Sequence, residues 1–117
     1  MNKKKVLIVE DRDTTQSGYR ASLQDDVQLL QAFTIEQARE IFGANPDIDL
    51  IVMDGCVPGF EINTPPLVRE FRKTFRGPII ATSSSSDYRQ ELMLAGCSHE
   101  VGSKGDVPDK VLALLSL

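Results

Sequence analysis

Five short apolar runs alternate with amphipathic stretches along the whole chain, and no other feature restricts the fold as strongly. The runs are rich in β-branched or large apolar residues and are bounded by turn formers, which predicts strands. The stretches between them place apolar residues at helical spacing. Strict alternation with short connections implies a parallel sheet with helices on both faces. The expected strands are residues 6–9, 27–33, 50–53, 79–82 and a weaker run at 99–102.

Capping residues and prolines mark where the helices begin. Thr34 and Gln37 form a capping box, in which each side chain satisfies a backbone N–H of the other residue. Gly43 and Pro46 are expected to end that helix. Prolines fit the first turn of a helix, where a missing N–H costs little. The other helices are expected to begin at Asp13 or Thr14, at Thr64 with Pro65 and Pro66 in its first turn, near Ser86 or Asp87, and at Asp106 with Pro108 in its first turn.

The second and fifth strands are the expected edges of the sheet. The second contains the polar residues Gln28 and Gln31, and the fifth is poor in apolar residues. With 117 residues and neither an internal repeat nor a linker, we expect one domain over residues 1–117 and no output domain after it.

Composition excludes several classes of function. A net charge of −4 argues against a nucleic-acid partner, which requires a basic face. No apolar stretch reaches the ~18 residues of a membrane helix, and no secretory signal begins the chain. Cys56 and Cys97 match no metal-ligand spacing, and His99 is the only histidine. We therefore expect a cytoplasmic protein with no nucleic-acid or membrane partner.

Acidic residues follow two of the apolar runs. Glu10 and Asp11 come directly after the first run, and Asp54 comes directly after the third. In a parallel sheet these strand ends share one edge, where open α/β sheets bind ligands. Clustered carboxylates repel one another, and a divalent cation with oxygen ligands is the usual remedy. This geometry points to phosphoryl chemistry on an aspartate.

With these residues in this order, the chain resembles the response-regulator receiver domain of two-component signalling. The family's acidic pair is matched by Glu10 and Asp11, and its phosphoaccepting aspartate by Asp54. A small hydroxyl residue after the fourth strand is matched by Ser83, and a lysine after the fifth by Lys104. The resemblance covers essentially all 117 residues. It implies a flavodoxin-like α/β sandwich of three layers with strand order 2-1-3-4-5.

The resemblance assigns a role to each of these residues. Asp54 would attack a phosphoryl group in line, and phosphoryl transfer depends chiefly on positioning and charge neutralisation. Lys104 and the Ser83 hydroxyl would contact phosphoryl oxygens. The implied cofactor is Mg²⁺, which prefers oxygen ligands and keeps several waters. Its expected ligands are Asp11, Asp54 and the backbone carbonyl of Cys56, with Glu10 acting through a water.

The resemblance also implies partners. A sensor histidine kinase or a histidine phosphotransfer protein would supply the phosphoryl group, and a downstream target protein would dock on the chain. The chain would not be an enzyme for other substrates, because it transfers phosphoryl groups only to its own Asp54. Phosphorylation would switch the face made by the fourth helix, the fifth strand and the fifth helix.

Two departures from the family pattern concern the end of the chain. Gly105 follows Lys104 where receivers usually have proline, and the stretch from Gly96 to Lys104 is about one residue longer than usual. This leaves open whether Lys104 reaches the site. Receivers also often carry a switching aromatic in the fifth strand, which is missing here. The switch candidates are Ser83, His99, Glu100 and Val101.

Two alternative functions remain. The first is a pseudo-receiver, an interaction module that is never phosphorylated. The second is a haloacid-dehalogenase-type phosphatase, since the segment from Asp11 to Thr15 fits a D-x-D-x-T pattern with Asp11 as nucleophile. Against the phosphatase, Glu10 would crowd that nucleophile, no later acidic pair completes a metal site, and Asp54 would have no role.

Overall fold

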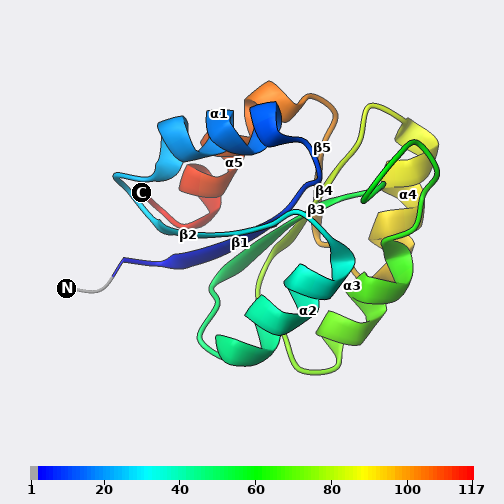
Figure 1. The fold of residues 1–117 in the computed structure, drawn as a ribbon, viewed down its shortest axis with the longest axis horizontal. Coiled ribbons are helices and arrows are strands. Elements are labelled where there is room, and N and C mark those ends of the chain that lie inside the picture. The colour runs from blue at the N-terminus through cyan, green and yellow to red at the C-terminus, as the bar shows by residue number, and fades with distance from the viewer. Residues whose placement is uncertain (1–2) are drawn as a thin grey trace.

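A five-stranded parallel sheet lies between two layers of helices in the computed structural model, which describes residues 3–117 (Figure 1). The strand order is β2-β1-β3-β4-β5, which confirms the expected fold class and both expected edge strands. The elements are β1 (Lys5–Val9), α1 (Asp13–Leu23), β2 (Gln28–Ala32), α2 (Ile35–Ala44), β3 (Leu50–Asp54), α3 (Pro65–Arg72), β4 (Ile79–Thr82), α4 (Ser86–Ala95), β5 (His99–Val101), a 3₁₀ turn η1 (Lys104–Asp106) and α5 (Val107–Leu114).

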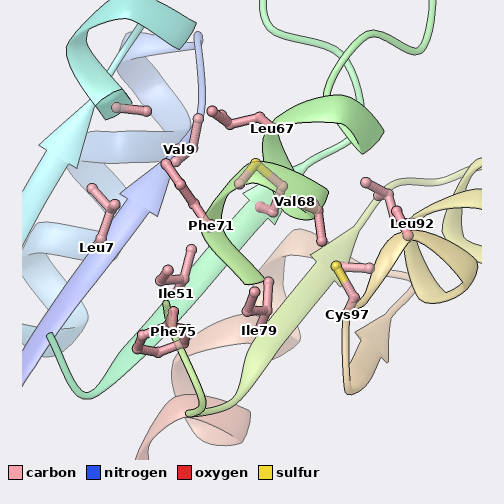
Figure 2. Close-up of a cluster of buried hydrophobic side chains, with 14 of the residues drawn as sticks. Leu7, Val9, Ile51, Leu67, Val68, Phe71, Phe75, Ile79, Leu92 and Cys97 are labelled. Carbon is pink, nitrogen blue, oxygen red and sulfur yellow. The ribbon is translucent and has the colours of Figure 1, made fainter. Parts of the chain in front are cut away.

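Strand β1 pairs with both β2 and β3, and the alternation of its side chains divides the core in two. Leu7 and Val9 face α2, α3 and α4, where Phe71 and Leu67 of α3 pack against the sheet (Figure 2). The rings of Phe71 and Phe42 stack with their centroids 4.0 Å apart. The opposite cluster lies under α1 and α5 and includes Val6, Ile8, Leu50, Val52, Tyr19, Leu23, Val107 and Val111.

The capping box at the start of α2 forms with one change of partner. The Thr34 hydroxyl accepts the N–H of Gln37 at 3.0 Å, as expected. The Gln37 side chain accepts the N–H of Phe33 at 2.8 Å, although Thr34 was its predicted partner. This bond occupies the N–H of Phe33, which lies outside β2, so the strand is shorter than predicted.

Helices α1 and α3 begin within one residue of the predicted positions, but neither N-cap residue makes a side-chain capping bond. Helix α1 begins at Asp13, and the residue before it, Arg12, makes no side-chain capping bond. Its N–H is instead bonded to Glu10 Oε2 at 3.1 Å. Thr64 precedes α3 but does not cap it through its side chain. The neighbouring side chains make other bonds instead: Glu10 lies two residues before Arg12 and accepts its N–H, and the Thr64 hydroxyl bonds the end of β3.

A buried glutamine and a partly buried arginine fix the backbone at opposite ends of the sheet. The Gln16 side-chain nitrogen lies 3.1 Å from the carbonyl oxygens of Ile8, Glu10 and Ala32. Gln16 thereby ties α1 to the ends of β1 and β2, next to the acidic residues.

Arg72 is the second of these side chains, and it anchors the C-terminal end of α4. It donates from Nε to the carbonyl of Gly96 at 2.7 Å and from Nη1 to the carbonyl of Gly77 at 2.6 Å. Gly96 has a φ of 134°, and a Cβ there would lie 2.8 Å from Arg72 Cγ. Only glycine fits that position. Within residues 3–117, no helix has the length and apolar character needed to cross a membrane.

Candidate functional site

Asp54 is the last residue of β3, and contacts on both sides fix its backbone. The N–H of Gly55 donates to the carbonyl of Thr82 at 3.1 Å. The buried Thr64 hydroxyl donates to the carbonyls of Asp54 and Gly55, at 2.6 and 3.1 Å. These bonds hold the carboxylate at the sheet edge, where Asp54 is only 7% exposed.

Glu10, Asp11 and Asp54 form one acidic cluster, as the strand ends predicted. Their carboxylates offer oxygen atoms that lie within 4.8 Å of one another. Burial, followed by the charge of Glu10, raises the pKa of Asp54 to about 7; Lys104 opposes this shift and Asp11 adds to it. Because the charged form of Asp54 is disfavoured here, a bound cation would stabilise it.

Lys104 lies inside this cluster despite the longer loop before it. Its Nζ donates to Glu10 Oε1 and lies 3.5 Å from Asp54 Oδ2. The turn η1 begins at Lys104, and the N–H of Asp106 is bonded to the carbonyl of Ser103 at 3.0 Å. The sequence left open whether Lys104 reaches the site, and in the structure it contacts Glu10 and Asp54.

Ser83 and Cys56 line the same cleft, whose volume is about 450 Å³. The Ser83 hydroxyl accepts the N–H of Ser85 at 3.1 Å, so its own proton is free to be donated into the cleft. Burial and the charge of Asp54 raise the pKa of the Cys56 thiol. A protonated thiol is a poor metal ligand, which favours the backbone carbonyl as the contribution of Cys56.

The donor set fits Mg²⁺. Hard oxygen donors are gathered on Asp11 and Asp54. Burial, and then the charges of Glu10 and Asp11, raise the pKa of Asp54, and a divalent cation would oppose these effects. The residues that would hold the ion are the predicted ones: Asp11, Asp54 and the Cys56 carbonyl, with Glu10 through a water.

No family model matches the chain, and no curated protein matches it either. Solved structures do match. A two-component response regulator from Clostridium difficile has a TM-score of 0.83 at 17% identity, with 97% of each chain covered. The chemotaxis protein CheY4 of Vibrio cholerae has a TM-score of 0.79 at 22% identity, also with 97% of each chain covered. The chain has the fold of a response-regulator receiver domain.

A third similar receiver structure includes a partner. It is the crystal structure of the P1 domain of CheA3 in complex with CheY6 from R. sphaeroides. The match has a TM-score of 0.77 at 19% identity and covers 100% of each chain.

In this receiver fold, only one of the four switch candidates lies in the cleft. That residue is Ser83. Val101 is buried in the cluster under α1 and α5, and His99 Nδ1 lies 2.8 Å from the Ser98 hydroxyl. Glu100 points to the surface and pairs with Arg89 of α4, with Nε 2.9 Å from Oε1.

The sequence did not reveal two residues that support the receiver site. Arg89 Nη1 donates to the carbonyl of Ser83 at 2.6 Å, and the Thr64 hydroxyl bonds the backbone around Asp54. The sequence feature that could have pointed to Arg89 is Gly102, because a glycine there leaves room for the guanidinium. For Thr64, a helix-capping position was the more common interpretation of a threonine before two prolines.

Proposed function

We propose that the chain is a phosphoacceptor signalling domain of a two-component or phosphorelay system, phosphorylated on Asp54 in the presence of Mg²⁺. The observation that carries this proposal is the convergence of Asp54 with Glu10, Asp11 and Lys104 at one edge of a receiver-type sheet. Phosphoryl transfer requires such a preset arrangement of charge more than it requires covalent help from the protein.

In the proposed reaction, an Asp54 carboxylate oxygen forms a bond to phosphorus while the bond to the donor breaks. The donor is a phosphohistidine or an acyl phosphate, and its leaving atom keeps the bonding electron pair. Lys104 would move from Glu10 to a phosphoryl oxygen, and the Ser83 hydroxyl would donate to another. A bound Mg²⁺ would supply charge neutralisation at the phosphoryl oxygens.

A phosphotransfer partner accords with this role. The similar structure of CheY6 with the P1 domain of CheA3 supports a histidine kinase or a histidine phosphotransfer protein as the donor for this chain. A downstream target protein would recognise the phosphorylated form. The chain would act on no substrate other than its own Asp54.

The pseudo-receiver alternative is favoured by one observation. The strand β5 has glutamate and no aromatic among its three residues, so a conventional switch is missing. The phosphatase alternative requires Asp11 as nucleophile, but Asp54 is the more buried carboxylate and has Lys104 beside it. We therefore keep Asp54 as the nucleophile in the proposal.

The test is intact-mass analysis after incubation with Mg²⁺ and acetyl phosphate. We expect one phosphoryl group per chain, mapped to Asp54, and none in Asp54→Asn or without Mg²⁺. The control is Asp26→Asn, at an exposed turn, which should be labelled like the unchanged protein. Label on Asp11, or label retained in Asp54→Asn, would revive the phosphatase hypothesis. A protein that binds Mg²⁺ but takes no label would be a pseudo-receiver.

A further inference from the structure

The Arg89 side chain connects three elements next to the cleft. It extends from α4, and only 17% of it is exposed. Nη1 donates to the carbonyl of Ser83 at 2.6 Å, and Nε donates to Glu100 Oε1 of β5 at 2.9 Å. The planar fork of a guanidinium can make both bonds at once, whereas a lysine ammonium is a single point charge.

Gly102 makes room for this arrangement. A Cβ at Gly102 would lie 3.3 Å from Arg89 Nη1 and 3.5 Å from Cζ, so the guanidinium would have to shift by a few tenths of an ångström to admit it. The φ of Gly102 is not in the left-handed region, so the backbone does not require glycine there. Glycine at this position leaves the Arg89 guanidinium the room that it occupies.

The Arg89 contact completes the restraint of Ser83. The Ser83 hydroxyl accepts the N–H of Ser85, and the Ser83 carbonyl accepts from Arg89. Side chain and backbone are thus held separately, with the hydroxyl proton left for the cleft. If Arg89 were lost, the carbonyl would lose its charged donor and the residue could shift away from the phosphoryl position.

We propose that Arg89 is a positioning residue for Ser83, and that Glu100 and Gly102 hold its guanidinium in place. This inference rests on the proposed phosphorylation of Asp54. Glu100 lies on the exposed surface of β5, and the Arg89 side chain would connect it to Ser83 in the site. A ligand that neutralises Glu100 would release one of the two bonds that hold Arg89.

The experiment measures the rate of Asp54 phosphorylation by acetyl phosphate at saturating Mg²⁺. We expect Arg89→Gln to lower the maximal rate about tenfold, because small misplacements of reacting groups cost up to roughly a hundredfold. Mg²⁺ affinity should not change, since the Arg89 side chain bonds Ser83 and Glu100 and none of the expected metal ligands. The control is Arg39→Gln, which breaks an exposed pair with Glu70 at 3.1 Å and should leave the rate unchanged.

A double-mutant cycle separates positioning from general damage. If Arg89 acts through Ser83, then Arg89→Gln should slow the reaction no more than about twofold in a Ser83→Ala background. Glu100→Gln should have a smaller effect than Arg89→Gln, because an amide oxygen still accepts from Nε. Gly102→Ala should also slow the reaction. It tests the position of the guanidinium without removing Arg89, and so it can be used if Arg89→Gln does not fold.

Two results would overturn this inference while leaving the proposed function intact. The first is a phosphorylation rate in Arg89→Gln equal to that of the wild type. The second is an equal reduction of the rate by Arg89→Gln in the wild type and in the Ser83→Ala background. For a poorly folded Arg89→Gln, a wild-type rate in Gly102→Ala would do the same. Absence of label on the wild type would instead overturn the proposed function, and this inference with it.

Discussion

Burial and two neighbouring carboxylates raise the pKa of Asp54 to about 7, and Lys104 offsets only part of this effect. In the unfolded chain the same group has a pKa near 3.8. Between these two values the folded protein holds a proton that the unfolded chain releases. The stability of the metal-free protein should therefore fall as pH rises from about 4 to about 7, and this contribution should be constant above that window.

The pH prediction is tested with Asp54→Asn. The asparagine cannot titrate, so the wild type should lose up to about 4 kcal/mol more than the variant across the window. Urea unfolding with a chelator, at about pH 5 and about pH 8, should record about 3 kcal/mol of this difference, because it samples only the part of the window above pH 5. Equal changes with pH in the two proteins would show that Asp54 titrates normally.

Tyr19 carries a buried hydroxyl that has no hydrogen-bond partner among the described residues. Burial raises the pKa of this hydroxyl, followed by the charges of Glu10 and Asp54. An unpaired buried hydroxyl costs about 1–3 kcal/mol. We expect Tyr19→Phe to stabilise the protein by about 1 kcal/mol in urea unfolding, since the ring stays in place. A clear loss of stability would show that the hydroxyl has a partner.

Individual site residues differed in how well the sequence predicted them. Glu10, Asp11 and Asp54 were placed correctly in one cluster, because a carboxylate directly after a buried strand can only lie at the sheet edge. The position of Lys104 depended on the shape of a loop, which spacing does not determine. Arg89 was missed because one partner lies in the loop after β4 and the other in β5, and neither shares a local pattern with it.

At the scale of elements, Thr64 joins helix α3 to the end of strand β3. Its hydroxyl bonds two carbonyls in a fully buried position. Thr64→Val keeps the shape but leaves these carbonyls without that donor, so we expect a loss of about 1–3 kcal/mol in urea unfolding. The exposed Thr14→Val should stay within about 0.5 kcal/mol of the wild type. Similar losses in both variants would mean that the Thr64 bonds contribute little.

Helices and strands were predictable to within a few residues where local signals decide them. The box of Thr34 and Gln37 begins α2 because a hydroxyl and an amide three residues apart can satisfy free N–H groups locally. The starts of α1 and α3 were also predicted to within a residue, but the bonds made there were not. Thr64 bonds β3 and does not cap α3 with its side chain, and Glu10 accepts the N–H of Arg12 just before α1.

For the whole molecule, the alternation of strands and helices was sufficient to predict a parallel sheet covered on both faces. The polar residues of β2 and the few apolar residues of β5 identified the edges. The order of the inner strands came from the family resemblance, because periodicity alone does not say that β1 pairs with β3.

The acidic cluster spans β1 and β3, so metal binding should stabilise the entire domain. At a Mg²⁺ concentration of ten times Kd, mass action adds about 1.4 kcal/mol to unfolding. Asp11→Asn removes one of the repelling charges. It should raise the melting temperature without metal and weaken Mg²⁺ binding, both measurable by calorimetry. If Mg²⁺ affinity were unchanged in this variant, Asp11 would not be a ligand.

The bond from Arg72 to the carbonyl of Gly96 holds the C-terminal end of helix α4. This ten-residue rod, roughly 15 Å long, is pinned just after its last residue and begins beside the cleft. Its first turn is also held, because Arg89 bonds the Ser83 carbonyl and Glu100. A shift of Ser83 should therefore reach α4 through Arg89, at the end of the helix next to the cleft. The opposite end, where Leu92 and Ala95 are buried in the core, should move least.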